Sequence, residues 1–362
     1  MIRVLLAGGG TGGHLMPALA LADALRAARV DLEPVLVGAL RGVEATVLPR
    51  RAYRYHLLPA EPIYRRAWWR NLRWPLLWPR LWRATRAVLA EERPRLVVGT
   101  GGYAAGLVLL AAHRAGIPIA VQEQNAYPGV TSRRAARWAA QVHLGFPEAA
   151  RRIRPGRGTT VFSLGNPIVP PPAERSRAEA RRALGLDPGR PVVLVTGGSQ
   201  GARAVNRAVA EVLAAGGFGD VALLWSTGMA THADYAALDR PPAVQVRPFW
   251  DPIATAYAAA DLVVARAGAM SVAELAAWGL PSILVPLPTA AADHQSANAA
   301  AIAAAGAAIH LPERALNGAR LAQEVRGLLT DPARLRVMAE AARQRGQPNA
   351  AHAIAGCLLD LL

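Results

Sequence analysis

The sequence contains no lysine and only one cysteine. Without lysine, the phosphate-binding loop Gly-x-x-x-x-Gly-Lys-Ser/Thr cannot occur, which excludes a P-loop phosphotransferase. The single cysteine, Cys357, cannot form an intrachain disulfide and fits a reducing compartment. We therefore expect an intracellular chain that is held together without covalent cross-links.

Long hydrophobic runs are missing as well. No window offers about 18 strongly apolar residues free of charge and proline, the length that a membrane-spanning helix needs. The apolar run 2–7 is too short for the core of a signal peptide. There is no Asp-x-Asp motif, and none of the eight histidines has the spacing of a metal site. We expect a chain that crosses no membrane and binds neither metal nor cofactor.

Negative charge is scarce relative to positive charge. The 41 basic residues, all of them arginine, exceed the 25 acidic residues and give a formal net charge of +16. Such a charge attracts nucleic acid, anionic lipid or a phosphorylated ligand. Because 52% of the 362 residues are hydrophobic, the chain is too apolar to be disordered.

Short apolar runs alternate with helical stretches along the chain, and this pattern is typical of parallel sheets covered on both faces. The proline-rich segment 165–172 separates two sets of runs and is predicted to be a linker. We predict an α/β protein with two Rossmann-like, doubly wound domains facing across a cleft. Their expected ranges are 1–165 and 166–341, with a C-terminal helix at about 342–362 packing back on the first domain. The expected strands are 4–7, 34–37, 96–99, 117–121, 142–144 and 161–163, then 192–196, 222–225, 244–247, 262–265 and 282–285.

Each half begins with a strand, a glycine-rich turn and a helix, at 4–13 and at 193–201. Glycine lets the backbone approach a ligand, and the free N–H groups at the helix start attract phosphate, although such turns also serve packing alone. Gly8, Gly10 and Gly13 match the dinucleotide fingerprint. That reading also needs an acid at the end of the second strand to hold a ribose, and none is there. The sequence therefore argues against a dinucleotide enzyme.

Five motifs occur in an order that resembles the MurG family of peptidoglycan N-acetylglucosaminyltransferases, which have the GT-B fold. They are GGTGGH at 9–14, GGY at 101–103, QEQN at 122–125, GGSQG at 197–201 and RAGAMSVAE at 266–274. The resemblance covers nearly the whole chain. It implies an enzyme of cell-wall synthesis that moves N-acetylglucosamine (GlcNAc) from UDP-GlcNAc to the 4-hydroxyl of undecaprenyl-diphosphate-linked N-acetylmuramoyl-pentapeptide. The transfer would invert the anomeric carbon.

The resemblance also assigns residues to the donor. It implies that Glu274 holds both ribose hydroxyls, that the backbone at Trp250 reads uracil, and that Gln295 contacts the sugar. The helix start after the loop 197–201 would stabilise the departing diphosphate. The expected UDP-GlcNAc contacts are Thr11, Gly12, Gly13, Asn125, Ser199, Gln200, Gly201, Trp250, Ala269, Met270, Ser271, Val272, Ala273, Glu274 and Gln295.

Two residues compete for the role of general base, His14 and Glu123. An imidazole titrates near neutral pH and suits proton transfer from a hydroxyl, while the alternative for His14 is a capping or packing role. Tyr103 is expected to contact the acceptor. The chain departs from the family at Val169, where relatives carry an arginine near the diphosphate, and Arg203 is a candidate replacement.

Residues 62–90 contain no acid and carry five of the nine tryptophans among arginines. Tryptophan settles at the membrane–water boundary, and each nearby arginine adds about 1 kcal/mol of attraction to anionic headgroups. Two prolines, Pro75 and Pro79, predict a loop or a broken helix. We expect this segment to attach the protein peripherally to the cytoplasmic face of the cell membrane. The expected membrane residues are Trp68, Trp69, Trp74 and Trp78.

The end of this segment has the spacing of a core helix. Its inward positions are expected to be Leu81, Trp82, Thr85, Val88 and Leu89. Trp82 is therefore assigned to the core and not to the membrane.

Two alternatives stay open from sequence alone. The first is another GT-B enzyme of UDP-sugars, either a different lipid glycosyltransferase or a UDP-GlcNAc epimerase, although an epimerase needs more carboxylates around the sugar. The second is a basic nucleic-acid-binding protein. The basic density is local and the glycine loops suit a diphosphate, so no nucleic-acid partner is expected.

Overall fold

The computed structural model describes residues 1–62, 64, 68–172, 176–198 and 201–362, without the side chains of Trp68 and Arg70. These residues form two compact units. The first comprises Met1–Val169 with Pro348–Leu362, and the second comprises Pro170–Gln347.

The first unit is built on a parallel sheet whose strand order is β3-β2-β1-β4-β5-β6-β7. Its strands are β1 Ile2–Gly8, β2 Leu32–Ala39, β3 Arg54–Leu58, β4 Leu96–Gly101, β5 Ile119–Glu123, β6 Gln141–Leu144 and β7 Thr160–Phe162. Its α-helices are α1 Gly12–Ala28, α2 Glu44–Val47, α3 Trp74–Glu92, α4 Gly102–Arg114, α5 Val130–Ala135 and α13 Ala350–Leu359.

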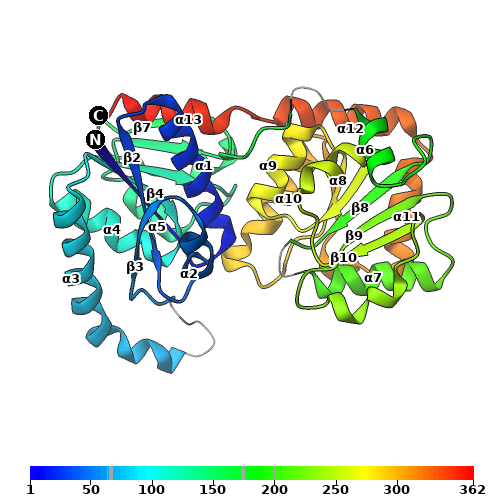
Figure 1. The fold of residues 1–362 in the computed structure, drawn as a ribbon, viewed down its shortest axis with the longest axis horizontal. Helices are drawn as coiled ribbons and strands as arrows, with labels where there is room; N and C mark the ends of the chain where they lie inside the picture. The colour runs from blue at the N-terminus through cyan, green and yellow to red at the C-terminus, as the bar shows by residue number, and fades with distance from the viewer. Residues whose placement is uncertain (63, 65–67, 173–175, 199–200) are drawn as a thin grey trace. The chain divides into compact units, whose positions relative to one another are not determined.

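Helices cover both faces of this sheet because its central strands carry apolar residues on both faces. Val4 and Leu6 of β1 belong to the core under α1 and α13, which lie side by side in Figure 1. Leu5 and Ala7 of the same strand belong to the opposite core, under α3 and α4. Successive side chains of a strand point to opposite faces, so a continuous apolar run requires a layer on each side.

The second unit repeats this architecture with the order β10-β9-β8-β11-β12-β13, again with parallel pairing. Its strands are β8 Val192–Thr196, β9 Ala222–Ser226, β10 Val244–Arg247, β11 Leu262–Ala265, β12 Ser282–Leu284 and β13 Ala308–His310. Its α-helices are α6 Arg177–Ala183, α7 Arg203–Ala214, α8 Ile253–Ala259, α9 Ala269–Trp278, α10 His294–Ala304, α11 Gly318–Leu329 and α12 Pro332–Arg345.

The strand order reverses at the same place in both units. The chain leaves β1 toward one sheet edge and returns to β4 on the other side of β1, and β8 and β11 repeat this arrangement. In open α/β sheets, ligands bind at such switch points, beyond the carboxyl ends of the strands. The glycine motifs after β1, β4 and β8 and the 266–274 motif after β11 all lie at these ends. The predicted pair of Rossmann-like domains is confirmed.

All eleven expected strands form, and two further strands were missed. β3, at Arg54–Leu58, is an edge strand whose first residues are exposed, so it lacks an apolar run. β13 at the edge of the second sheet has only three residues, Ala308–His310. Edge strands are half solvated, and their sequences therefore carry a weaker pattern.

The expectation of a broken helix at the prolines was wrong. The 3-10 helix η2, Trp68–Arg73, leads directly into α3, which continues from Trp74 to Glu92 with Pro79 inside it. Pro75 stands in the first turn, where its missing N–H costs no bond, and Pro79 removes one hydrogen bond close to the helix start. The predicted inward face is confirmed, because Leu81 is buried and Trp82 packs against the core.

Candidate functional site

The glycine loop after β1 is closed by a carboxylate of the chain itself. Glu44 is fully buried, and its Oε1 accepts hydrogen bonds from the N–H of Ala39 at 2.7 Å and of Gly10 at 2.9 Å. Three glycines make room for it, since a Cβ on any of them would lie 2.1–2.3 Å from the Glu44 side chain. They are Gly9, Gly38 and Gly42. The Gly10 N–H therefore donates to Glu44 and is not available to bind a phosphate.

His14 lies in the first turn of α1 and faces the turn between β4 and α4. Its Nδ1 lies 3.1 Å from the carbonyl oxygen of Thr100 and 3.0 Å from Oε1 of Gln124. A Cβ on Gly101 would lie 2.9 Å from this nitrogen, and Gly101 has φ +97°, so the position suits glycine for two reasons. Within the described part of the chain, Nε2 of His14 has no hydrogen-bond partner.

Glu123, the other candidate base, is occupied by its own loop. Its Oε1 accepts from the backbone N–H of Asn125 at 2.9 Å, and its Oε2 accepts from the N–H of Gly129 at 2.9 Å. The side chain is 2% exposed. These contacts favour a role for Glu123 in shaping the loop that carries Asn125.

Tyr103 packs against the first glycine loop. A Cβ on Gly10 would lie 2.5 Å from the Tyr103 ring, so the two residues are in close contact. Burial raises the pKa of the Tyr103 hydroxyl, and nearby Glu44 raises it further. The hydroxyl therefore stays protonated at neutral pH and can donate a hydrogen bond to a ligand. Thr11, Gly12 and Gly13 are exposed beside it at the start of α1.

In the second unit, Gly201 of the loop between β8 and α7 lies close to the backbone of Thr227. A Cβ on Gly201 would lie 2.2 Å from the carbonyl oxygen of Thr227, and Gly201 has φ +78°. The loop ends at α7, where Arg203 is the first helical residue and is exposed. Two expected diphosphate contacts, Ser199 and Gln200, lie outside the described residues.

Glu274 of α9 is oriented by a tyrosine. The hydroxyl of Tyr257 in α8 donates to its Oε2 at 2.9 Å. Burial raises the pKa of Glu274, and the hydrogen bond from Tyr257 opposes that rise. The Tyr257 pKa is raised well above its ordinary value, chiefly by burial, so this hydroxyl remains a donor. Two expected neighbours, Ala269 and Val272, point into the core. The other expected contacts on this helix are half-buried, namely Met270, Ser271 and Ala273.

Trp250 and Gln295 also have defined surroundings. The Trp250 ring is 5% exposed, with the Arg247 guanidinium 4.8 Å from its centroid, and its indole nitrogen has no partner among the described residues. Gln295 uses its Oε1 to accept the N–H of Leu287 at 2.9 Å. Its amide nitrogen makes no hydrogen bond to the described residues and can donate to a ligand.

Apolar side chains are exposed on η2 and the beginning of α3. Trp69 is 59% exposed, Leu72 71%, Leu76 74% and Trp78 46%. Trp74 is half-buried, and the side chain of Trp68 lies outside the described part. Four exposed arginines accompany them, namely Arg73, Arg80, Arg83 and Arg86. We call these exposed apolar side chains and arginines the Trp/Arg surface. None of the described helices has both the length and the hydropathy needed to cross a membrane.

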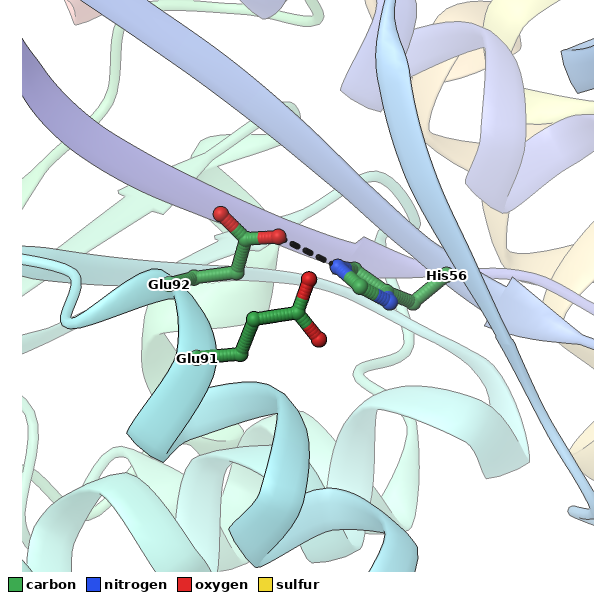
Figure 2. A group of neighbouring side chains, drawn as sticks. All are labelled: His56, Glu91 and Glu92. Atoms are coloured by element: carbon green, nitrogen blue, oxygen red, sulfur yellow. Dashed lines mark hydrogen bonds and ion pairs between the residues drawn. The ribbon is translucent and has the colours of Figure 1, made fainter.

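One cluster among the described residues has the composition of a metal site (Figure 2). It joins His56 of β3 to Glu91 and Glu92 at the end of α3. His56 Nε2 lies 2.5 Å from Glu92 Oε1, and the Arg54 guanidinium reaches Glu92 at 2.6 Å and Glu91 at 2.7 Å. Arg3 also reaches Glu92, at 3.4 Å, so two arginines balance the two carboxylates and the cluster serves as an ion-pair network at the sheet edge.

Val169, where the resemblance implies an arginine, is 79% exposed. The sequence analysis gave no role to four residues that have defined positions in the two units, namely Glu44, Gln124, Asn166 and Tyr257. Each acts on another residue of the chain, and no motif spacing announces such a contact. Gly9, Gly38 and Gly42 were the available signal for Glu44, because together they leave space for one large side chain.

Comparison with known proteins gives concordant results along the whole chain. Residues 4–144 match the glycosyltransferase family 28 N-terminal domain, and residues 192–354 match the C-terminal domain of the same family. The chain is 41% identical to the UDP-N-acetylglucosamine–N-acetylmuramyl-(pentapeptide) pyrophosphoryl-undecaprenol N-acetylglucosamine transferase of Moorella thermoacetica, over 99% of this chain and 98% of that protein. The transferase of the same name from Salinibacter ruber is 42% identical, with 99% and 96% covered. The crystal structure of Acinetobacter baumannii MurG has a TM-score of 0.78 at 27% identity, with 99% of this chain and 100% of that chain covered.

Proposed function

The chain belongs to glycosyltransferase family 28, and from this premise we propose that it transfers GlcNAc from UDP-GlcNAc to undecaprenyl-diphosphate-linked N-acetylmuramoyl-pentapeptide. The observation that carries this proposal is the sequence identity of 41% and 42%, over nearly the full length, to two transferases named for that reaction. The enzyme is a GT-B glycosyltransferase of peptidoglycan synthesis. The resemblance implies a single displacement that inverts the anomeric carbon, and one general base suits such a step.

The second unit holds the donor in this proposal. The two ribose hydroxyls donate to Glu274, whose orientation the Tyr257 hydroxyl fixes. Uracil lies against the backbone at Trp250, and the Gln295 amide nitrogen donates to a sugar hydroxyl. The diphosphate lies at the start of α7, where free N–H groups and the helix dipole stabilise the charge that grows as UDP leaves. Arg203, exposed at that helix start, supplies the positive charge that relatives place at the position of Val169.

The first unit activates the acceptor. His14 Nε2 accepts the proton of the 4-hydroxyl as that oxygen attacks C1 of GlcNAc. The C1–O bond to the diphosphate breaks, its electron pair leaves with UDP, and the proton stays on His14. Glu123 shapes the loop that presents Asn125 to the donor sugar, and Tyr103 donates to the acceptor. No metal is needed in this scheme, because helix dipoles and arginine stabilise the leaving group.

The lipid-linked acceptor places the reaction at a membrane surface. We propose that the Trp/Arg surface attaches the enzyme peripherally to the cytoplasmic face. Its exposed side chains, among them Trp69, Leu72 and Leu76, enter the interface while the arginines meet anionic headgroups. Exposed apolar area of this kind is expensive in water and marks an interaction site. Nucleic acid is not a partner in this account.

The experiment is a transfer assay with labelled UDP-GlcNAc and the lipid-linked muramoyl-pentapeptide in detergent. We expect label in the lipid extract, a loss of turnover in His14→Ala, and weaker donor binding in Glu274→Ala. Absence of transfer by a folded protein that binds UDP would refute the proposal. Formation of free UDP-N-acetylmannosamine would instead indicate the epimerase alternative.

A further inference from the structure

A buried chain of three amide side chains runs from Gly165-Asn166-Pro167, at the start of the proline-rich segment, to His14. Its members are Asn166, Gln122 and Gln124, each no more than 2% exposed. They lie in the loop 163–172 after β7, in β5, and directly after β5. The sequence motifs containing these residues have no other explanation in the proposed mechanism.

Backbone carbonyls fix the orientation of the first amide. A carbonyl oxygen can only accept, so the Asn166 Nδ2 that lies 3.0 Å from the Gln124 carbonyl must be the donor. The Asn166 Oδ1 then faces Gln122, whose Nε2 donates to it at 3.0 Å. The Gln122 Oε1 in turn accepts from the Nε2 of Gln124.

A second pair of carbonyls fixes the last amide independently. The Gln124 Nε2 donates to the carbonyl of Thr100 at 2.8 Å and lies 3.0 Å from the carbonyl of Gln122. The reversed orientation would bring the side-chain oxygen against these carbonyl oxygens and leave the buried groups without donors, which is costly. The Gln124 Oε1 therefore points at His14.

The consequence concerns the proton on the imidazole of His14. Its Nδ1 faces two oxygens, the Thr100 carbonyl at 3.1 Å and Gln124 Oε1 at 3.0 Å, and neither oxygen can donate. The proton of the neutral ring is thus held on Nδ1, and the lone pair is left on Nε2. A base needs that lone pair on the side where the acceptor hydroxyl arrives.

We propose that Gln124 is a positioning residue, which holds His14 in the Nδ1–H tautomer through the amide chain that begins at Asn166. This inference rests on the proposed function, in which His14 is the general base. It assigns the glutamine of the 122–125 motif and the asparagine of the 165–167 motif to one task.

The first test reads the tautomer directly, without activity. Histidine labelled with 15N at both ring nitrogens is incorporated, and the spectrum is recorded at a pH where imidazole is neutral. The His14→Asn spectrum identifies the His14 signals among the eight histidines. We expect a protonated Nδ1 and a bare Nε2 in the wild-type protein. A protonated Nε2 would overturn the proposal, and this measurement needs no variant of Gln124 to fold.

The second test removes the acceptor with Gln124→Met, which keeps the length of the side chain. We expect kcat to fall about three- to tenfold, equivalent to about 0.7–1.4 kcal/mol at 1.36 kcal/mol per tenfold. The KM for UDP-GlcNAc should stay within about twofold, and the spectrum should show a share of the other tautomer. An unchanged kcat in Gln124→Met would overturn the proposal.

The matched control is Gln141→Met on the neighbouring strand β6. Gln141 is also buried, its Nε2 donates to the Cys357 carbonyl at 2.8 Å, and its Oε1 lies 3.1 Å from Nε2 of His143. It is the same kind of glutamine–histidine pair outside the site. We expect its loss to leave kcat unchanged, and an equal fall in kcat would show that Gln124→Met acts through general stability.

A double substitution separates positioning from independent action. In the His14→Ala background, Gln124→Met should cause no further fall in kcat, because its effect passes through the imidazole. A fall of the same size in both backgrounds would overturn the positioning role. If His14→Ala retains full kcat, the positioning role fails with the base assignment, while the transfer reaction measured in the same assay remains established.

Discussion

Replacing the two most exposed leucines of the Trp/Arg surface should detach the enzyme from lipid without unfolding it. Leu72 and Leu76 are 71% and 74% exposed. Full burial of a leucine side chain contributes about 1.5–3 kcal/mol, so exposed fractions near three quarters correspond to roughly 1–2 kcal/mol each. The double variant Leu72→Ser/Leu76→Ser should therefore lose about 2–4 kcal/mol of membrane affinity. At 1.4 kcal/mol per tenfold, this is a fall in vesicle partitioning of roughly 30- to 700-fold.

The assay is cosedimentation with vesicles that contain anionic phospholipid, repeated with purely zwitterionic vesicles. Binding by the wild-type protein should be stronger to anionic vesicles and should weaken with salt, because arginines contribute. Val337→Ser is the matched control, since Val337 is 68% exposed on α12 of the second unit. Thermal unfolding of the double variant should stay close to wild type, because exposed substitutions change stability by at most about 0.5 kcal/mol. Undiminished vesicle binding by a folded double variant would refute the assignment of this surface.

Three further predictions concern the glutamates of the two units. Because burial raises the pKa of Glu274, affinity for UDP-GlcNAc should fall with decreasing pH from a higher pH than for an ordinary glutamate. Calorimetric titration should show this fall in wild type and lose its Glu274-dependent part in Glu274→Gln. Tyr257→Phe removes the hydrogen bond to Glu274 and should weaken UDP binding about fivefold, near 1 kcal/mol. The same titration measures this change, and an affinity equal to that of wild type would contradict the orienting role of Tyr257. Glu44→Ala leaves the buried N–H of Ala39 without an acceptor and should lower the free energy of unfolding by about 1–3 kcal/mol. Urea unfolding measures this change, and an unchanged urea midpoint would show that the glycine loop after β1 is stable without Glu44.

The central strands were predictable because their apolar runs, although short, are continuous and buried on both faces, as in 4–7 and 192–196. The edge strand β3 was not, since its first residues face solvent and carry no such run. Pro79 was misread as a helix break because the rule for prolines ignores position, and one lost hydrogen bond near a helix start is tolerated when the following turns are packed.

The candidate site residues also divide into those that a local motif marks and those that only long-range contacts define. Residues inside glycine-rich motifs, such as His14, could be found because a strand, a tight turn and a helix leave a local signature. Asn166 could not, because its partners lie 42 and 44 residues away in the sequence. The bond of Glu44 to Gly10 spans 34 residues, and only the glycines around it gave a signal. Long-range side-chain contacts depend on strand order, which one sequence does not specify.

The most direct test of the central claim is the structure of the product. The enzyme is incubated with UDP-GlcNAc and the lipid-linked muramoyl-pentapeptide, and the glycolipid is isolated for mass and NMR analysis of the new linkage. A single GlcNAc joined in the β configuration to the 4-hydroxyl of the muramoyl sugar is the expected result. An α linkage, a different acceptor oxygen, or free GlcNAc with unmodified acceptor would contradict the account.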